Sequence, residues 1–202
     1  MTSKKLQLVI ILLITFIALL FSSCSKEDNA MNEVVKTEAQ KKLDEADKIF
    51  SSGEYDKASG IYEEALKLAE ETGNNSDKVE ALSMVARCHL ILDRKEDGRP
   101  WIEKAEAIAV DSEPSGWSRF LGVQGRYQWK DNELEKATST FETMYDFSLK
   151  HKLHSRAIDA AHMAAITGNP EQQVAWGLKG IKAAEEGNVT GWLGPLWNNL
   201  GW

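Results

Sequence analysis

The segment GEYDKASGIYEEALKLAEETGN, residues Gly53–Asn74, decides the fold. After the turn glycine, small and large apolar side chains follow one another at spacings of four, three and one, which places them along one stripe of a helix. These residues are Ala58, Tyr62, Ala65 and Leu66. The other face of the helix carries Glu, Lys and Asp, which suit a solvent-exposed side. Because one helix cannot bury such a stripe by itself, the segment predicts partner helices.

Related patterns return along the chain at intervals of roughly 40 residues, as in a helical repeat array. The matching positions are Ala46 and Ile49 before the first segment; Leu82, Val85, Ala86, Gly98, Ile102 and Ala105 in a second copy; Leu121, Gly125, Ala137 and Phe141 in a third; Ile158, Ala161, Val174, Leu178 and Ile181 in a fourth; and Trp197, Leu200 and Gly201 at the end. The small residues Ala46, Ala86 and Gly125 are expected to let facing helices approach closely. The recurrence predicts stacked helix pairs rather than a closed globule.

The pattern resembles the tetratricopeptide repeat, with its W-x₂-L-G-x₂-Y and A-x₃-F signature over two helices. The resemblance implies an all-α solenoid of antiparallel helix pairs over residues 34–202, with about four repeats and a truncated fifth. Turn residues place the predicted helices near 34–51, 54–72, 76–92, 95–109, 116–130, 133–150, 153–166, 170–187 and 191–202. The apolar last helix lacks a following partner, so we expect the array to be cut inside a repeat. The alternative is that this helix is an unusual cap or that it contacts another subunit.

Residues 1–23 are typical of a secretory leader, with Lys4 and Lys5 ahead of an apolar run over residues 6–21. That run is shorter than the roughly 20 residues of a membrane span. It ends in FSSC, which resembles a bacterial lipobox and implies lipidation of Cys24. The alternative is an ordinary signal peptide with a chance cysteine.

The residues after Cys24 form a polar segment, 24–33, that we interpret as a tether. Its Ser-Lys-Glu-Asp sequence is similar to the tract that directs some Gram-negative lipoproteins to the cell surface. We therefore expect a lipid-anchored protein of the outer membrane, and the similarity of this tract implies exposure at the cell surface.

The composition is that of a globular, acidic protein, with 27% charged residues and a formal net charge of −7. Loss of Lys4 and Lys5 with the leader would change this charge to −9. Such a balance argues against general nucleic-acid binding, which needs a basic surface. The two cysteines, Cys24 and Cys88, cannot form a disulfide framework.

The sequence lacks the common catalytic motifs: it has no G-x-S-x-G elbow, no P-loop and no dinucleotide-binding glycine motif. The histidines 89, 151, 154 and 162 have no cysteine or carboxylate at a recognisable zinc spacing. Cys88 is expected to be a packed core thiol. We therefore expect neither an enzyme nor a metal or other cofactor.

One basic stripe could bind a partner. Arg119, Arg126 and Lys130 are spaced by seven and four, so they share a helix face. The family resemblance implies that this face lies in a concave groove lined by the first helix of each pair, together with Arg87 and Arg156. Cations in an acidic protein would suit an acidic peptide or a carboxylate terminus. A solvated face with local salt bridges is the alternative.

The seven tryptophans are expected to serve mainly as core residues, including Trp197 at the tryptophan position of the family signature. Trp129 remains a candidate for partner contact, by stacking on a sugar or an aromatic peptide.

Together these features predict a non-catalytic module that binds a protein or peptide partner at a bacterial envelope. Three other interpretations remain open: a structural subunit of an outer-membrane assembly machine, a glycan-capture lipoprotein, and the repeat region of a longer signalling protein.

Overall fold

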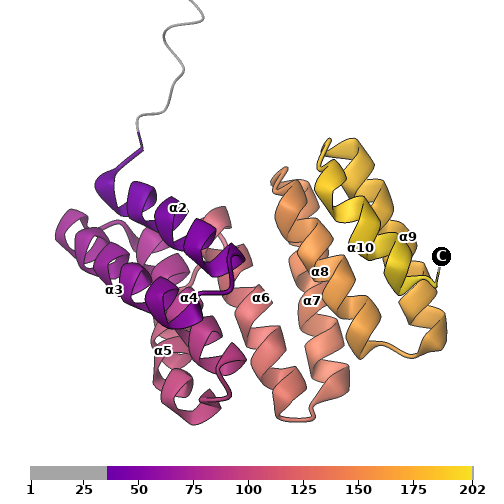
Figure 1. The fold of residues 1–202 in the computed structure, drawn as a ribbon, viewed down its shortest axis with the longest axis horizontal. Coiled ribbons are helices and arrows are strands. Elements are labelled where there is room, and N and C mark those ends of the chain that lie inside the picture. The colour runs from indigo at the N-terminus through magenta and orange to yellow at the C-terminus, as the bar shows by residue number, and fades with distance from the viewer. Residues whose placement is uncertain (1–35, 202) are drawn as a thin grey trace, which may run out of the picture. The chain divides into compact units, whose positions relative to one another are not determined.

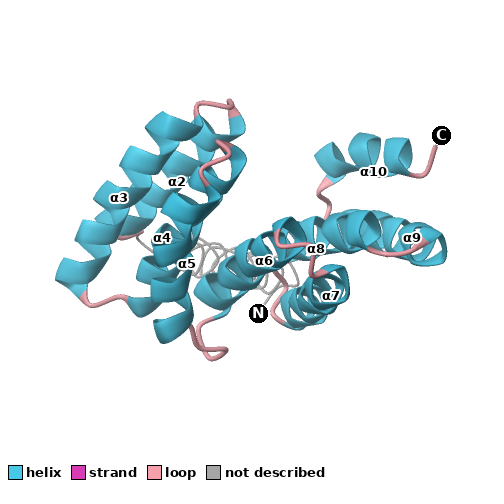
Figure 2. Ribbon diagram, turned by 90° about the horizontal axis from the view of Figure 1, so that it is seen from below, coloured by secondary structure: helices cyan, strands magenta, loops and turns pink. Residues whose placement is uncertain are grey.

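The computed structural model describes residues 36–201, which form helices joined by short loops (Figure 1). The predicted leader, Cys24, the tether, the first two positions of the first predicted helix and Trp202 lie outside the described residues. Within residues 36–201 there is no strand (Figure 2). The elements are α2 (Glu38–Ser51), α3 (Tyr55–Thr72), α4 (Asn75–Ile91), α5 (Lys95–Ile108), α6 (Pro114–Lys130), α7 (Leu134–Lys150), α8 (His154–Thr167), α9 (Pro170–Glu186), the 3₁₀ helix η1 (Thr190–Trp192) and α10 (Leu193–Asn199). The all-α prediction is confirmed for this part of the chain, and most helix ends agree with the sequence to within about two residues.

Local side-chain chemistry begins several of these helices. Thr37 and Asn169 each form a capping box, with Gln40 and Gln172 respectively, so that side chains satisfy backbone groups at the starts of α2 and α9. Asn74 caps α4 by accepting a hydrogen bond from the backbone N–H of Asp77. The starts of these helices are therefore determined by local residues of the sequence.

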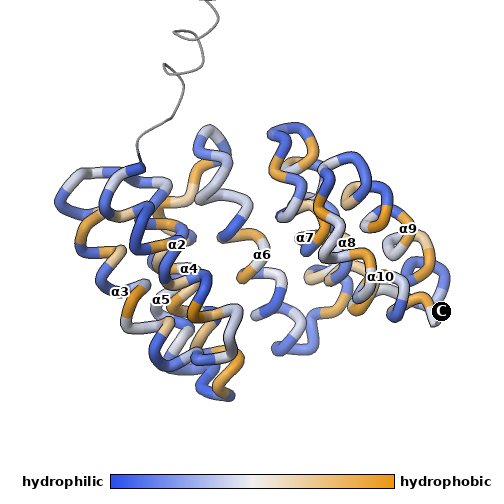
Figure 3. The backbone as a smooth tube through the Cα atoms, turned by 45° about the horizontal axis from the view of Figure 1, so that its top comes forward, coloured by the Kyte–Doolittle hydropathy of each residue, from blue (hydrophilic) through white to orange (hydrophobic). Residues whose placement is uncertain are grey.

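The second helix of each pair buries the same three-part pattern: a small residue, a large one four positions later, and a third residue three positions after that. The sets are Ala58, Tyr62 and Ala65 in α3; Gly98, Ile102 and Ala105 in α5; Ala137, Phe141 and Met144 in α7; and Gly177, Ile181 and Ala184 in α9. Hydropathy alternates along each helix as this pattern requires (Figure 3). The described chain is thus a repeat-like array of helix pairs.

The fourth copy was predicted only in part. Val174 and Leu178 of α9 were expected in the core, but they are 53% and 51% exposed. Gly177 and Gly180 are buried instead, because Leu200 and Leu196 of the last helix lie against them. Of the three predicted core positions on α9, Val174 and Leu178 are therefore wrong, whereas Ile181 is buried as predicted.

The last helix also differs from the prediction. Trp197 was expected in the core but is 39% exposed, whereas its neighbour Leu196 is only 1% exposed. The short α10 is oriented so that Leu196, rather than the tryptophan, contacts α9 at Gly180. Among residues 36–201, no helix is both long enough and apolar enough to cross a bilayer.

The packing changes between the second and third helix pairs. From α2 to α5 and from α6 to α9 each helix packs closely against the next along the chain, whereas α6 packs only slightly against the preceding helix α5 and closely against α4 instead. The backbone N–H of Gly116 donates to the Ser76 hydroxyl at 3.0 Å, and the Asn75 side-chain amide donates to the Ile108 carbonyl at 2.9 Å. These bonds hold the end of α5 and the first turn of α6 against the start of α4. As a result, α4 is surrounded by α3, α5 and α6 and is buried on most sides.

Candidate functional site

The first helices of the four pairs, α2, α4, α6 and α8, contribute charged side chains to one shared surface, which we call the inner face. Its members are Asp47, Glu80, Arg87, Arg119, Arg126, Arg156 and Asp159. All four arginines come from the predicted partner-binding set. The three carboxylates were not predicted.

Two ion pairs of the inner face join helices that are not neighbours. Arg119 of α6 contacts Asp47 of α2 at 2.7 Å, and Arg156 of α8 contacts Glu80 of α4 at 3.0 Å. Because adjacent helices pack 8–10 Å apart, α2 and α6 in a flat layer with α4 between them would be roughly 16–20 Å apart. Side chains can close that distance only if the array curves toward this side. The inner face is therefore concave.

In this cluster, burial and the nearby carboxylates shift the pKa values of the arginines in opposite directions. Burial would lower the pKa of Arg119, but the carboxylates of Asp47 and Glu80 outweigh it and raise that pKa. At Arg156 the carboxylates do not outweigh burial: burial, and then the nearby charge of Arg119, lowers its pKa to about 10. Both arginines stay charged at neutral pH. Tyr62 of α3 adds a hydrogen bond, donating its hydroxyl to Asp47.

A pocket of about 470 Å³ opens on the inner face between α4, α6 and α8. We call it the inner-face pocket. It is lined by Arg87, Leu90, Ile91 and Asp93 from α4 and the turn after it, by Arg126, Trp129 and Lys130 from α6, by Asp159, His162 and Met163 from α8, and by Trp192 of η1. The structure thus brings Arg87, Arg126, Trp129 and Lys130 together, while Arg119 and Arg156 lie in the neighbouring ion-pair cluster.

Within the pocket, one arginine is neutralised and another is not. Arg126 donates to Asp159 at 2.6 Å and to the Gly122 carbonyl at 2.8 Å. Burial would raise the pKa of Asp159, but Arg126 and then Arg87 hold it well below its usual range. Arg87 itself makes no ion pair within 4.0 Å with any residue that the structure describes.

The Arg87 side chain is incompletely hydrogen-bonded in the pocket. Its Nε is buried and has no hydrogen-bond partner among residues 36–201. Burial, and then the like charge of Arg126, lowers the pKa of Arg87 to about 9. Its guanidinium lies over the ring of Phe50, 4.9 Å from the ring centroid, which supplies some cation–π stabilisation. The pocket therefore contains a charged group with unused hydrogen-bonding capacity.

Aromatic rings form other parts of the same pocket. Trp129 is partly buried, and the Lys130 ammonium lies 5.8 Å from its ring centroid. His162 and Trp192 lie with ring centroids 5.8 Å apart. Burial lowers the pKa of His162, so this imidazole is neutral at pH 7. The pocket combines cationic and apolar contact surfaces.

The inner-face charges follow a pattern that the sequence contains. Glu80, Arg119 and Asp159 recur at intervals of about 40 residues with alternating sign, as in successive repeats. Asp47, Arg87 and Arg126 form a second series at the same spacing, in which the sign changes only between Asp47 and Arg87. A comparison of charge sign at equivalent repeat positions would have identified the carboxylates, whereas inspection of single helices identified only the cations.

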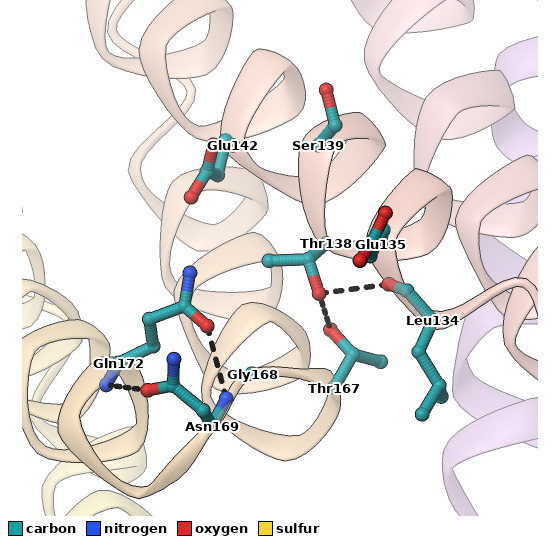
Figure 4. Close-up of a pocket in the computed structure, with 9 residues that line it drawn as sticks. All are labelled: Leu134, Glu135, Thr138, Ser139, Glu142, Thr167, Gly168, Asn169 and Gln172. Carbon is teal, nitrogen blue, oxygen red and sulfur yellow. Dashed lines mark hydrogen bonds between the residues drawn. The ribbon is translucent and has the colours of Figure 1, made fainter.

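A second pocket, of about 540 Å³, lies between α7, the end of α8 and the start of α9 (Figure 4). Its polar groups mostly bond to each other. Thr138 donates to Thr167 at 2.8 Å, and the Asn169 and Gln172 side chains complete the capping box of α9. Because these groups are satisfied within the fold, this pocket offers fewer contacts to a ligand than the inner-face pocket.

Residues considered for catalysis or metal binding have other surroundings. Cys88 is fully buried, as predicted, and burial raises the pKa of its thiol to about 12. Such a thiol is not a nucleophile at neutral pH. In residues 36–201, no group of three or more His, Cys, Asp or Glu side chains is placed to hold a metal ion.

Comparison of the sequence with protein-family models found no matching family, and comparison with curated proteins found no matching relative.

Proposed function

We propose that this chain is a non-catalytic interaction module that binds a segment of a partner protein on its inner face. The observation that carries this proposal is the inner-face pocket, where Arg87 and Lys130 lie beside Trp129 on a curved surface. Repeat arrays of helix pairs use such extended concave surfaces for binding. The array also matches the tetratricopeptide pattern in the buried series on its second helices, so we propose membership in that repeat class.

The chemical character of the inner face favours an acidic partner segment. The protein as a whole is acidic, with a formal net charge of −7, yet the pocket is lined by more cationic than anionic side chains. A guanidinium offers a planar pair of donors that suits a carboxylate. Electrostatic complementarity of this kind gives specificity and speeds association.

We further propose that the module is held at the bacterial outer membrane by lipidation of Cys24. The support is the apolar run of residues 6–21 followed by FSSC. Replacement of the cysteine in Cys24→Ser is expected to move the protein from the membrane fraction to the soluble fraction and to abolish incorporation of labelled fatty acid. Retention in the membrane with unchanged labelling would contradict the anchor.

Site-specific photo-crosslinking in native membranes tests the binding role. A benzophenone amino acid is placed at Ile91, which is 43% exposed at the edge of the inner-face pocket. The control position is Ser139, an exposed residue at the second pocket between α7, α8 and α9. We expect one defined protein adduct from position 91 and not from position 139, identified by mass spectrometry. Identical adducts from both positions, or none from position 91, would refute binding on the inner face.

A further inference from the structure

The inner-face pocket has a specific chemical deficiency: a buried cation without an anion. Arg126 is neutralised by Asp159, but Arg87 forms no ion pair with any described residue and leaves its Nε without a partner. An unsatisfied buried polar group costs free energy, more so when it is charged. Removing such a cost by ligand binding contributes directly to affinity, so Arg87 is the natural anchor for an anion.

The remaining volume of the pocket needs more than a carboxylate to fill it. Its roughly 470 Å³ is within the 300–1,000 Å³ range of small-ligand sites, which usually combine apolar walls with a few polar groups. Leu90, Met163 and Trp192 supply apolar wall. A ligand that uses the whole pocket therefore has an anionic group and a bulky apolar body close to each other.

We propose that the inner-face pocket binds two adjacent residues of an extended partner segment, an acidic residue and an aromatic one. The carboxylate pairs with the Arg87 guanidinium, and the aromatic ring lies against Trp129 and Trp192. This inference deepens the proposed function, because it rests on a protein partner and names the residues that the pocket recognises. Edge-to-face or stacked aromatic contacts would add to the area buried by the ring.

The test measures binding of defined peptides to the full chain by isothermal titration calorimetry or by NMR line broadening. The probe is an acetylated and amidated peptide, Gly-Gly-Phe-Glu-Gly-Gly. One matched peptide has Gln in place of Glu, a second has Ala in place of Phe, and a third probe is free 3-phenylpropionate. We expect the first peptide to bind and each matched peptide to bind about tenfold more weakly or worse, the size of one charge-assisted hydrogen bond or one aromatic contact.

The decisive variant is Arg87→Gln. Because Arg87 is a buried charge without an ionic partner, its replacement is expected to leave the melting temperature unchanged or higher, while peptide affinity falls about tenfold or more. Lys104→Gln is the control, a cation removed at another site: Lys104 lies 5.1 Å from the Trp101 ring centroid, as Lys130 lies over Trp129, but in a pocket between α3, α4 and α5. This control should bind the peptide like the wild-type protein. Lys130→Gln removes an exposed cation of the inner-face pocket and should weaken peptide binding several-fold. This second variant tests the need for a cation without changing a buried group.

Several results would overturn the inference. Equal affinity for the Glu and Gln peptides, or unchanged affinity in both Arg87→Gln and Lys130→Gln, removes the anionic anchor. Binding of 3-phenylpropionate without the peptide assigns the pocket to a small free acid instead. Absence of binding by all probes at millimolar concentration also rejects the site. Crosslinking from position 91 that persists in Arg87→Gln would reject this pocket chemistry while leaving the proposed function intact.

Discussion

Glycines at two helix positions illustrate how strongly single residues are constrained in this array. Gly98 of α5 lies where an added Cβ would be 2.1 Å from the Tyr127 hydroxyl oxygen and 2.8 Å from the His89 Cβ. The hydroxyl cannot move freely, because it donates to the Ala86 carbonyl at 3.0 Å. Gly60 of α3, by contrast, has open space where its Cβ would be.

The same substitution should therefore have opposite effects at these two positions. Gly98→Ala is expected to lower the free energy of unfolding by about 1–3 kcal/mol through overpacking. Gly60→Ala should raise it by about 0.5–1 kcal/mol, because alanine is the better helix former. Urea denaturation of both variants measures the two changes. A stabilised Gly98→Ala protein would contradict the close approach of α5 and α6 at Tyr127.

The sequence predicted the burial of individual residues well where their local spacing determines that burial. Ala58 and Tyr62 are fully buried as their spacing requires, and Gly98 takes the place of an alanine because Tyr127 needs the space. The burial of Arg119 and Arg126 was not predictable in the same way. Their partners Asp47 and Asp159 lie on other helices, and contacts over such sequence distances are set by curvature rather than by local periodicity.

At the scale of elements, the turns between helices repeat a backbone conformation with positive φ. Gly53 has φ of 86°, and Asn132 and Lys152 have φ of 64° and 59°. Glycine and asparagine tolerate this left-handed region, but a lysine does so only with strain. The α7–α8 turn is therefore less well adapted than the α2–α3 turn.

Replacing that lysine should relieve the strain. Lys152→Gly is expected to raise the free energy of unfolding by roughly 0.5–1 kcal/mol. The substitution removes the strain of a left-handed lysine, but part of that gain is lost because glycine makes the unfolded chain more flexible. Gly53→Ala is the reciprocal control and should lower it by about 1 kcal/mol. Thermal or chemical denaturation of the two variants measures both effects. Destabilisation by Lys152→Gly would show that the lysine side chain makes a compensating contact.

Helix positions were readable because their breaks use Gly, Asn and Pro, as at Gly73 and Pro170. The packing of the helices against one another was harder to predict from the sequence. A regular solenoid would pack α6 on the preceding helix α5, but α6 packs on α4 instead. The hydrogen bonds from Asn75 and to Ser76 that fix this arrangement join residues 33 to 40 positions apart and have no signature in periodicity.

For the whole molecule, the inner-face ion pairs make stability depend on acid pH. The pKa of Asp159 and that of Asp47 are both lowered in the folded protein, because for each carboxylate the arginines nearby outweigh the effect of burial. A carboxylate whose folded pKa is depressed contributes stability above its unfolded pKa, near 3.9, and loses it as pH falls through the folded value. Stability should therefore decline progressively below about pH 5.

Removal of one of these carboxylates should reduce that pH dependence. Asp159→Asn leaves Arg126 buried without its anion, so the free energy of unfolding at pH 7 should fall by about 3 kcal/mol. The difference from the wild-type protein should shrink as pH falls toward 2. Asp56→Asn is the control, because the Asp56 side chain is 73% exposed and pairs with Arg94 at the surface. A parallel pH profile for wild type and Asp159→Asn would contradict the role assigned to the buried pair.

The curvature of the array itself depends on Glu80, which accepts from Arg119 at 3.3 Å and from Arg156 at 3.0 Å. With a side chain only 12% exposed, this carboxylate draws α6 and α8 toward α4. Glu80→Gln should lower the free energy of unfolding by about 3 kcal/mol, since two buried cations lose their shared anion.

The variant should also change the shape of the folded protein. Repulsion between Arg119 and Arg156 would open the inner face, so small-angle X-ray scattering should give a larger radius of gyration than that of the wild-type protein at equal helix content. Glu45→Gln, at a carboxylate 52% exposed and paired with Lys42, provides the control and should change stability by less than about 1 kcal/mol and leave the radius unaltered. An unchanged radius in Glu80→Gln would mean that backbone packing at α4 and α6 sets the curvature without the ion pairs.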